Sequence, residues 1–356
     1  MKYCIILGTR PEIIKFSSII RYLNNNNKDF IIIHTNQHYS AKLDSIFFSE
    51  LKLPNAKYNL NIGSGSHGEQ TGKMLYQIEK VLIEEKPDIV FVQGDTNTVF
   101  SGALAASKLN IKIGHIEAGL RSYDRSMPEE INRIMTDHIS NYLFVPTLNS
   151  KKTLLNEGIN EEKIICTGNT IVDAVFQNLK LASERFVILD KFGIKKDSYI
   201  LLTAHRAENT DDIIKLKGIF KGAHLVALET RYPVICPIHP RTRKMLDLYN
   251  IEIPDNIFVI EPLGFLDFLY LQKNAAVVLT DSGGIQEECC ILNVRCVTLR
   301  ENTERPETIE VGGNILAGTN AEKILSCTKE ILKIENNWKN PFGDGKSYMH
   351  ILNSIN

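Results

Sequence analysis

The sequence has no long apolar run and no cysteine pattern that would assign it to a special class. Its seven cysteines include no CxxC pair and lie mostly within apolar stretches, so we expect reduced core residues and no disulfide framework. No segment approaches the roughly 18 apolar residues of a membrane span, and the apolar run after Lys2 is shorter than the core of a signal peptide. The chain is therefore expected to be cytoplasmic.

An excess of one charge is missing as well. The 41 basic and 42 acidic residues give a net charge of −1, whereas a nucleic acid or a membrane surface needs a concentrated positive field on its partner. The sequence contains no HExxH, Walker or GxSxG motif and no cluster of metal ligands, so neither a metal nor a cofactor is expected. Residues 63–68 fit GxGxxG, but they follow no strong apolar strand, so we do not interpret them as a nicotinamide site.

Alternating strands and helices fill most of the 356 residues, a length that suits two domains. Almost continuous apolar runs predict buried parallel strands, and amphipathic stretches predict the helices that cover them. The first series has strands at 4–7, 30–33, 88–92, 111–116, 143–145 and 164–166 and helices at 12–23, 43–51, 98–109 and 129–140. The second has strands at 199–203, 234–236, 257–260, 276–280, 296–299 and 315–316. The sequence therefore predicts an α/β protein with two Rossmann-like domains whose parallel sheets face each other across a cleft.

Residues 281–288, DSGGIQEE, lie where a buried strand passes into a helix. Gly283 and Gly284 leave backbone N–H groups open to an oxyanion, Ser282 offers a hydroxyl, and the helix start adds partial positive charge. Glu288, one turn further along, could accept hydrogen bonds from ribose hydroxyls. These residues predict a nucleoside diphosphate site; the alternative is a plain strand-to-helix turn with acidic residues that satisfy the helix dipole.

The first strand leads into GTRPE at 8–12, with Lys15 one helical turn further on. Pro11 suits the start of a helix, where the helix dipole disfavours a cation. Two cations near that start, Arg10 and Lys15, are therefore expected to bind an anion, with a solvated surface as the alternative.

Carboxylates follow two later strands of the first series. QGDT at 93–96 supplies Asp95, HIEAGLR at 115–121 supplies Glu117, and PEEINR at 128–133 places Glu129 at a helix start. Carboxylates that face one cleft acquire the raised or split pKa values that acid and base catalysis uses. For Glu129, interaction with the helix dipole is an alternative explanation.

In the second series two histidines follow strands. TAHR at 203–206 contains His205, and IHPR at 238–241 contains His239. Each is either a site residue at the carboxyl edge of the second sheet or a structural histidine.

Seven motifs together carry a resemblance to a known family. They are GTRPE with Lys15, QGDT, HIEAGLRS, PEEINR, TGNT at 167–170, TAHR, and DSGGIQEE followed by ENTERPE at 301–307. In this order and spacing the chain resembles the non-hydrolysing UDP-N-acetylglucosamine 2-epimerases over nearly its whole length.

The resemblance implies the glycosyltransferase B arrangement, with a first domain at 1–170, a UDP-binding domain at 171–337 and a C-terminal helix at about 338–356 that crosses back to the first. It implies reversible interconversion of UDP-GlcNAc and UDP-ManNAc without NAD, in polysaccharide biosynthesis, by a homodimer. The implied substrate-binding residues are Arg10, Lys15, His239, Phe268, Ser282, Gly283, Gly284 and Glu288, with Phe268 near the uracil. The implied catalytic residues are Asp95, Glu117, Glu129 and His205.

Carbon 2 of UDP-GlcNAc has no neighbouring carbonyl group that would make its proton acidic, so we expect UDP to leave first and 2-acetamidoglucal to form. A glycosyltransferase of the same architecture and a nucleotide-sugar binding protein are the alternatives. In bacterial relatives a second UDP-GlcNAc binds beside the substrate, and Gln37, His38 and Gln70 match some residues of that regulatory site.

Overall fold

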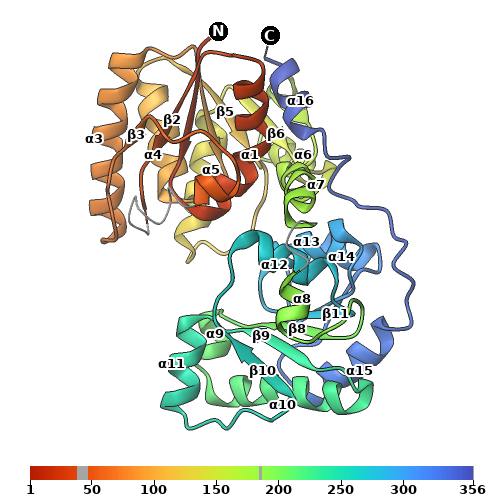
Figure 1. Ribbon diagram of the computed structural model, residues 1–356. Helices are drawn as coiled ribbons and strands as arrows, with labels where there is room; N and C mark the ends of the chain where they lie inside the picture. Colours follow the sequence, from red (N-terminus) through yellow and green to blue (C-terminus); the bar gives the residue numbers. More distant parts are fainter. Residues whose placement is uncertain (38–46, 184–186, 356) are drawn as a thin grey trace. The chain divides into compact units, whose positions relative to one another are not determined.

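The computed structural model describes residues 1–37, 47–183 and 187–355, and these form two compact units (Figure 1). The first unit comprises residues 1–177 together with the C-terminal segment from residue 342, and the second comprises residues 178–341. Each unit is an α/β structure around its own parallel sheet, so the predicted fold class is confirmed. The division after Gln177 lies inside a helix that continues to residue 182.

The described residues of the first unit contain a seven-stranded parallel sheet in the order β3-β2-β1-β4-β5-β6-β7. Its strands are β1 (Tyr3–Leu7), β2 (Phe30–His34), β3 (Tyr58–Asn59), β4 (Ile89–Gln93), β5 (Lys112–Ile116), β6 (Tyr142–Val145) and β7 (Ile164–Cys166). Every residue of β1 and β4 is buried, as expected for central strands covered by helices on both faces.

Several helices of the first unit begin shortly after a strand. The helices of this unit are α1 (Arg10–Asn25), α3 (His67–Glu85), α4 (Asn97–Lys108), α5 (Pro128–Ile139), α6 (Leu148–Asn156), α7 (Thr170–Ala182) and α16 (Ser347–Asn353), with a 3₁₀ turn at Glu161–Lys163. Residues 47–50 are also helical, inside the helix predicted at 43–51, whose first residues lie outside the described range.

The second unit contains a six-stranded parallel sheet in the order β10-β9-β8-β11-β12-β13 over its described residues. Its strands are β8 (Ile200–Thr203), β9 (Val234–Pro237), β10 (Ile257–Ile260), β11 (Val277–Thr280), β12 (Cys296–Thr298) and β13 (Asn314–Leu316). Its helices are α8 (Val187–Lys191), α9 (Ala207–Thr210), α10 (Ile213–Thr230), α11 (Pro240–Leu248), α12 (Phe265–Lys273), α13 (Gly283–Leu292), α14 (Pro306–Glu310) and α15 (Ala321–Ile331).

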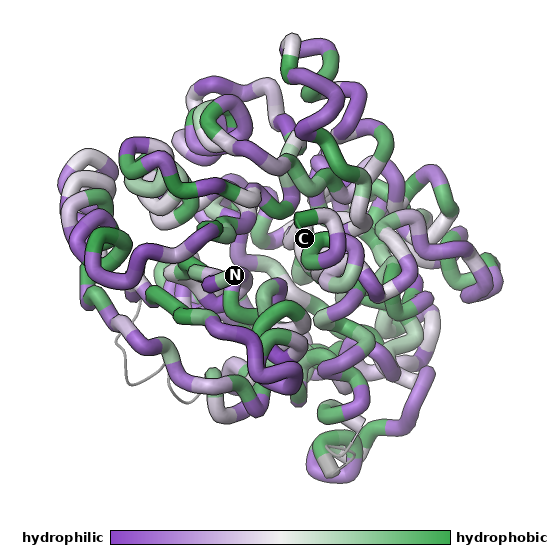
Figure 2. Tube along the Cα trace, turned by 90° about the horizontal axis from the view of Figure 1, so that it is seen from above, coloured by the Kyte–Doolittle hydropathy of each residue, from purple (hydrophilic) through white to green (hydrophobic). Residues whose placement is uncertain are grey.

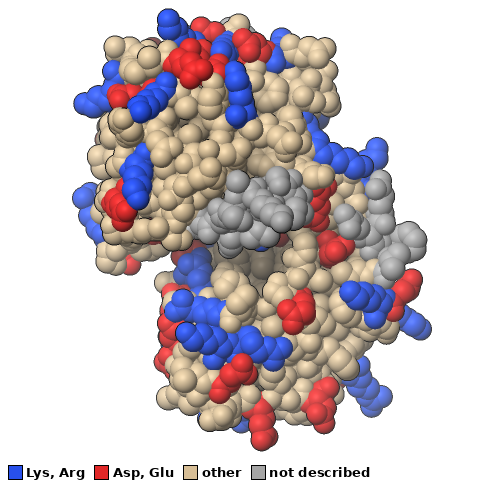
Figure 3. Space-filling model, turned by 60° about the vertical axis from the view of Figure 1, so that its left-hand side comes forward, with Lys and Arg blue, Asp and Glu red and all other residues tan. Residues whose placement is uncertain are grey.

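Each unit buries its own hydrophobic core between the sheet and the helices. Figure 2 shows hydrophobic and hydrophilic residues alternating along the helices, as expected for helices with one face on a sheet. On the face shown in Figure 3, basic and acidic side chains occur on both units. This face therefore carries charges of both signs, in keeping with the net charge of −1.

The C-terminal helix α16 lies beside α1 in the first unit (Figure 1). Its docking uses close contacts around Gly168, whose φ of +80° is natural only for glycine. A Cβ at Gly168 would stand 2.9 Å from Oγ of Ser347 and 3.1 Å from the carbonyl oxygen of Phe342. The carboxylate of Asp173 on α7 also accepts the backbone N–H of Tyr348 at 2.9 Å. This segment therefore belongs structurally to the first unit, although it follows the second in the chain.

Candidate active site

In both units several candidate site residues follow the two strands at which the strand order reverses. In the first unit β1 and β4 are neighbours, and the chain leaves them at Gly8 and Gly94. In the second unit β8 and β11 are neighbours, and the chain leaves them at Ala204 and Asp281. Ligands of open parallel sheets bind at this reversal, because the two following loops diverge there and leave a space at the carboxyl ends.

Glu12 ties together the loops that follow β1 and β4. Its carboxylate accepts the backbone N–H groups of Gly8 at 2.6 Å and Thr9 at 2.9 Å, and the hydroxyl of Thr96 at 2.6 Å. Burial raises the pKa of Glu12 to about 7, although these three hydrogen bonds oppose the shift. The loop that contains Arg10 is therefore fixed to the loop that contains Asp95.

Lys15 and Glu117 form an ion pair of 2.5 Å between Nζ and Oε2. Glu117 is buried and has a φ of +70°, a left-handed conformation that a residue with a side chain rarely adopts. In the sequence Lys15 was expected to bind a ligand anion. The structure places it against a carboxylate of the protein, one of the predicted catalytic residues.

Asp95 is also paired with a cation: its Oδ2 lies 2.5 Å from Nη2 of Arg133 on α5. Arg133 is held in turn by the buried Glu130, at 2.8 Å. Burial would raise the pKa of Glu130, but hydrogen bonds from the Ser122 backbone and Arg133 outweigh it and lower this pKa. Glu129 lies half-buried in the first turn of the same helix.

In the second unit the buried carboxylate of Asp281 organises the loop after β8. It accepts the backbone N–H groups of His205 and Arg206 at 3.0 to 3.1 Å and the side-chain amide of Asn209 at 3.1 Å. Nδ1 of His205 lies 3.5 Å from Oδ1 of Asp281. Burial lowers the pKa of His205, and the neighbouring His239 and Arg206 lower it further, while Asp281 opposes the shift. His205 is therefore a neutral imidazole near pH 7.

His239 lies beside His205, with ring centroids 5.6 Å apart. It is the N-cap of α11, where its Nδ1 accepts the backbone N–H of Arg241 at 3.1 Å. A ring nitrogen that accepts cannot carry a proton, so the exposed His239 has its donor on Nε2.

The start of α13 is open at its two glycines. Neither Gly283 nor Gly284 has a positive φ. A Cβ at Gly283 would meet nothing closer than Oε2 of Glu304 at 3.8 Å, and a Cβ at Gly284 nothing closer than Oγ of Ser282 at 4.0 Å. Neither backbone conformation nor internal packing therefore requires glycine at these positions, and the missing side chains leave room for a ligand against the helix start.

Two predicted residues of the second unit remain, and they lie on neighbouring helices. Phe268 is half-buried on α12, and Glu288 is half-buried on α13 itself. Helices α12 and α13 pack against each other.

Comparison with known proteins identifies the family. Residues 21–356 match the model of the UDP-N-acetylglucosamine 2-epimerase family. The chain belongs to this family. A UDP-N-acetylglucosamine 2-epimerase of Methanocaldococcus jannaschii is 60% identical over 358 residues, covering 99% of this chain and 98% of that protein. The suspected resemblance is therefore confirmed.

One solved structure and one more relative are also similar to this 2-epimerase family member. A crystal structure of the Methanocaldococcus jannaschii UDP-GlcNAc 2-epimerase in complex with UDP-GlcNAc and UDP matches with a TM-score of 0.89 and 59% identity, covering 100% of this chain and 99% of that one. A UDP-2,3-diacetamido-2,3-dideoxy-D-glucuronate 2-epimerase of Pseudomonas aeruginosa is 40% identical over 335 residues, covering 93% and 92%.

The sequence analysis of this 2-epimerase family member did not single out several charged residues around the site. Among them are Glu12, Glu130 and Arg133, and also Arg300, which bonds both oxygens of Glu304 at 2.8 to 2.9 Å. That bond with Arg300 lowers the pKa of Glu304 to about 2, against the effect of burial. Only the spacing of Glu12 after Thr9, and of Arg133 after Glu130, gave a local signal.

Gln37 and Gln70, which were expected to form a regulatory site, make hydrogen bonds within the protein. The amide of Gln70 donates to the carbonyl oxygens of Gln37 at 3.1 Å and Gly63 at 2.8 Å, and its oxygen accepts from Asn97 at 2.9 Å. Both glutamines are buried, and His38 lies outside the described residues.

Within the described ranges of this 2-epimerase family member, no group of three or more His, Cys, Asp or Glu is arranged to hold a metal ion. No helix in the same part of the chain is long and apolar enough to cross a membrane.

Proposed function

We propose that the chain interconverts UDP-GlcNAc and UDP-ManNAc by inverting carbon 2 of the sugar. The observation that carries the proposal is the open Gly283-Gly284 start of α13, which offers backbone N–H groups and space for a diphosphate. The relative with which the chain shares 60% identity bears the name of this activity, and its matched crystal structure contains UDP-GlcNAc and UDP.

The UDP moiety is assigned to the second unit, with help from Arg10. Ser282, Gly283 and Gly284 hold the diphosphate, and the Nε2 donor of His239 is free to add a hydrogen bond to it. Glu288 accepts from the ribose hydroxyls, and Phe268 lies near the uracil. Lys15 completes the predicted set, through its ion pair with Glu117.

The reaction starts with the departure of UDP, because direct removal of the carbon 2 proton is unfavourable without a neighbouring carbonyl. The cation of Arg10 and the helix start stabilise the charge that develops on the diphosphate. The sugar that remains is oxocarbenium-like and has a far more acidic proton at carbon 2. Loss of that proton gives 2-acetamidoglucal, and both steps are reversible.

Inversion then needs proton transfer on the two opposite faces of the sugar ring. Asp95, Glu117 and Glu129 are the candidates for this acid and base pair. The first two follow the neighbouring strands β4 and β5, which brings them to one edge of the sheet. His205, neutral because of its burial, assists or positions the reacting groups.

The experiment is a nuclear magnetic resonance time course of purified protein with UDP-GlcNAc alone in heavy water. We expect UDP-ManNAc with deuterium at carbon 2 and no need for added NAD. Product without deuterium, or activity that depends on NAD, contradicts the elimination mechanism. Affinity without turnover indicates a binding protein, and turnover only with an acceptor indicates a glycosyltransferase.

A second arm of the experiment uses the substrate named for the Pseudomonas aeruginosa relative, UDP-2,3-diacetamido-2,3-dideoxy-D-glucuronate. This sugar adds a carboxylate and a second acetamido group. We expect UDP-GlcNAc to be converted with the higher kcat/KM, in keeping with the higher identity to the relative named for it. The opposite ranking overturns the substrate assignment and leaves the epimerase chemistry in place.

A further inference from the structure

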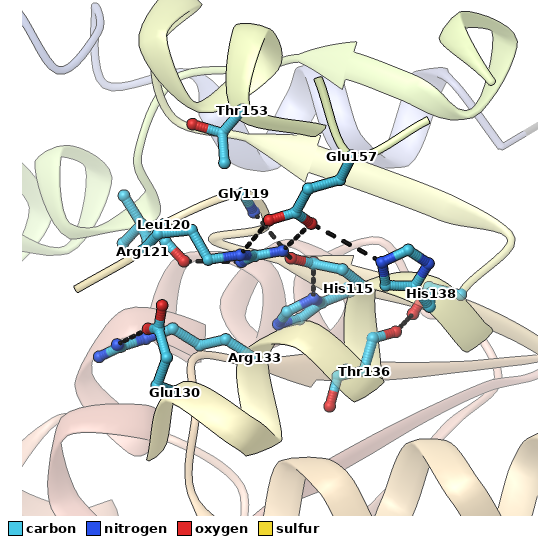
Figure 4. A network of polar contacts seen from close by, with 12 residues as sticks. His115, Gly119, Leu120, Arg121, Glu130, Arg133, Thr136, His138, Thr153 and Glu157 are labelled. Carbon is cyan, nitrogen blue, oxygen red and sulfur yellow. Dashed lines mark hydrogen bonds and ion pairs between the residues drawn. The ribbon is translucent and has the colours of Figure 1, made fainter. Parts of the chain in front are cut away.

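A buried network of polar contacts lies around His115 and Arg121 (Figure 4). Its centre is His115, the fourth residue of β5, whose side chain is 1% exposed. Nδ1 of His115 lies 2.7 Å from Oδ1 of Asp137 on α5, and Nε2 lies 2.9 Å from the carbonyl oxygen of Gly94. Neither His115 nor Asp137 has been assigned a role in the proposed reaction.

Both ring nitrogens of His115 face acceptors. A carbonyl oxygen can only accept, so Nε2 must donate to Gly94. Asp137 is held as a carboxylate, since its Oδ2 lies 2.8 Å from Arg121 Nη2 and accepts the backbone N–H of Gly119 at 3.2 Å. Nδ1 faces this carboxylate, so both ring nitrogens of His115 are in position to donate.

The charged groups around His115 are paired with one another. Arg121 also bonds both carboxylate oxygens of Glu157, at 2.7 and 2.8 Å, and the half-exposed His138 lies 3.7 Å from the same carboxylate (Figure 4). His115 and Arg121 thus face two carboxylates, Asp137 and Glu157. A satisfied buried network of this kind is rigid, because moving any member leaves a charge without its partner.

The network holds the main chain on both sides of the candidate catalytic residues. Gly94, whose carbonyl accepts from His115, directly precedes Asp95 and has a φ of +87°. Glu117 lies between His115 and Gly119, which are both bonded to Asp137, and it has the unfavourable φ of +70°. A backbone conformation of this kind persists only where its surroundings fix it.

We propose that His115, protonated on both ring nitrogens, is a positioning residue for the epimerisation: it fixes Gly94 directly and Gly119 through Asp137, and so holds Asp95 and Glu117 in their reacting geometry. The kinetic part of this inference rests on the proposed function. The protonation of His115 does not.

The kinetic test compares His115→Asn, which keeps a donor at the Nδ1 position, with His115→Gln, which keeps one near the Nε2 position. We expect each to lower kcat per folded molecule by about 10- to 100-fold, since a misplacement of about 1 Å can cost 100-fold. KM and the Kd of UDP should stay within about 2-fold, because the UDP-binding residues of the second unit are untouched. The matched control is His138→Asn: His138 follows Asp137 in the chain, its ring lies 3.7 Å from Glu157, and the variant should leave kcat unchanged.

A kcat of both His115 variants within about 3-fold of the unmodified protein overturns the positioning role, as does an equal loss in the His138 variant. If the His115 variants fail to fold, Asp137→Asn is measured in the same way, since it removes the charge that His115 faces. Nitrogen-15 spectra of the unmodified protein at pH 7.5 give a reading independent of turnover: two protonated ring nitrogens are expected. One unprotonated nitrogen on His115 overturns the inference, whereas absent epimerase activity with two protonated nitrogens contradicts only the proposed function.

Discussion

Asp95 and Glu117 are each paired with a cation that lies far away in the sequence, Arg133 and Lys15. We expect Asp95→Asn and Glu117→Gln to lower kcat by about 100- to 10,000-fold, the range typical of lost acid or base catalysis. UDP affinity should change little, and free UDP with 2-acetamidoglucal should accumulate in some variants, as seen by nuclear magnetic resonance. Glu84→Gln, an exposed carboxylate on α3, is the matched control. Full activity in both site variants would remove these residues from the mechanism.

Glu12 should make stability depend on pH in the direction opposite to that of an ordinary paired carboxylate. Burial raises its pKa from 4.5 to about 7, so the folded state binds a proton that the unfolded state has released. This contribution is fully present below pH 4.5 and is lost as the pH rises through 7. We measure the unfolding free energy of Glu12→Gln and of the unmodified protein by urea denaturation. Between pH 5 and pH 8 the difference between them should shift in favour of the variant by at most about 2.5 kcal/mol. A constant difference, like that expected for Glu84→Gln, contradicts this assignment.

The two open glycines of α13 allow binding to be separated from stability. Gly283→Ala and Gly284→Ala add a Cβ where the nearest atoms are 3.8 and 4.0 Å away. We therefore expect the free energy of unfolding to be unchanged or increased. UDP affinity should fall by about 10- to 100-fold if a charged hydrogen bond is lost. The reciprocal control is Gly222→Ala, whose Cβ would stand 2.7 Å from Cδ1 of Ile324 on α15. It should destabilise the protein and leave UDP affinity unchanged, as measured by calorimetry.

Sequence reasoning found the residues at the strand ends but not their partners. Asp95, Glu117, His205 and Ser282 follow apolar runs, and a chain that leaves a parallel sheet must present such residues at one edge. The ion pair of Lys15 with Glu117 joins positions 102 residues apart, and no local pattern encodes it. For the same reason the orientation of His115 toward Gly94 became visible only in the fold.

At the scale of elements, the sequence predicted the central strands and missed helix α3. The buried residues Met74, Ile78, Val81 and Leu82 of α3 have helical spacing, so the signal was present. The glycine-rich segment 63–68 follows the two-residue strand β3 and contains Ser66, whose hydroxyl caps α3. The predicted boundary between residues 170 and 171 lies at the start of α7, whereas the structure divides the chain after Gln177, inside that helix.

The docking of the C-terminal segment should depend on space at Gly168. Gly168→Ala combines an unfavourable φ with contacts of 2.9 and 3.1 Å to Ser347 and Phe342, whereas Gly158→Ala has the same φ range and nothing within 4 Å. We expect Gly158→Ala to cost about 1 kcal/mol of unfolding free energy and Gly168→Ala about 1 to 3 kcal/mol more. Urea denaturation of both variants gives the difference. Equal losses would mean that the C-terminal segment does not restrict this position.

At the scale of the whole molecule, Arg10 and Ser282 belong to different units. If one diphosphate binds to both, as the sequence predicts, UDP gains contacts only when the units approach. We expect small-angle scattering to show a smaller radius of gyration at saturating UDP. Uridine, which lacks the phosphates, should have no such effect. An unchanged radius with UDP would mean that the two units do not share this ligand.

The first unit is built from two segments of the chain, and this sets the order in which the units can be completed during synthesis. Residues 342–355, which include the buried Phe342, Ile351 and Leu352, are translated only after the entire second unit. Until then the surfaces of α1 and α7 that receive α16 remain exposed on the ribosome. The second unit, whose residues are contiguous, can fold on emergence as domains generally do. The unit that starts first therefore finishes last, and in that interval its uncovered surface is a natural place for a chaperone to bind.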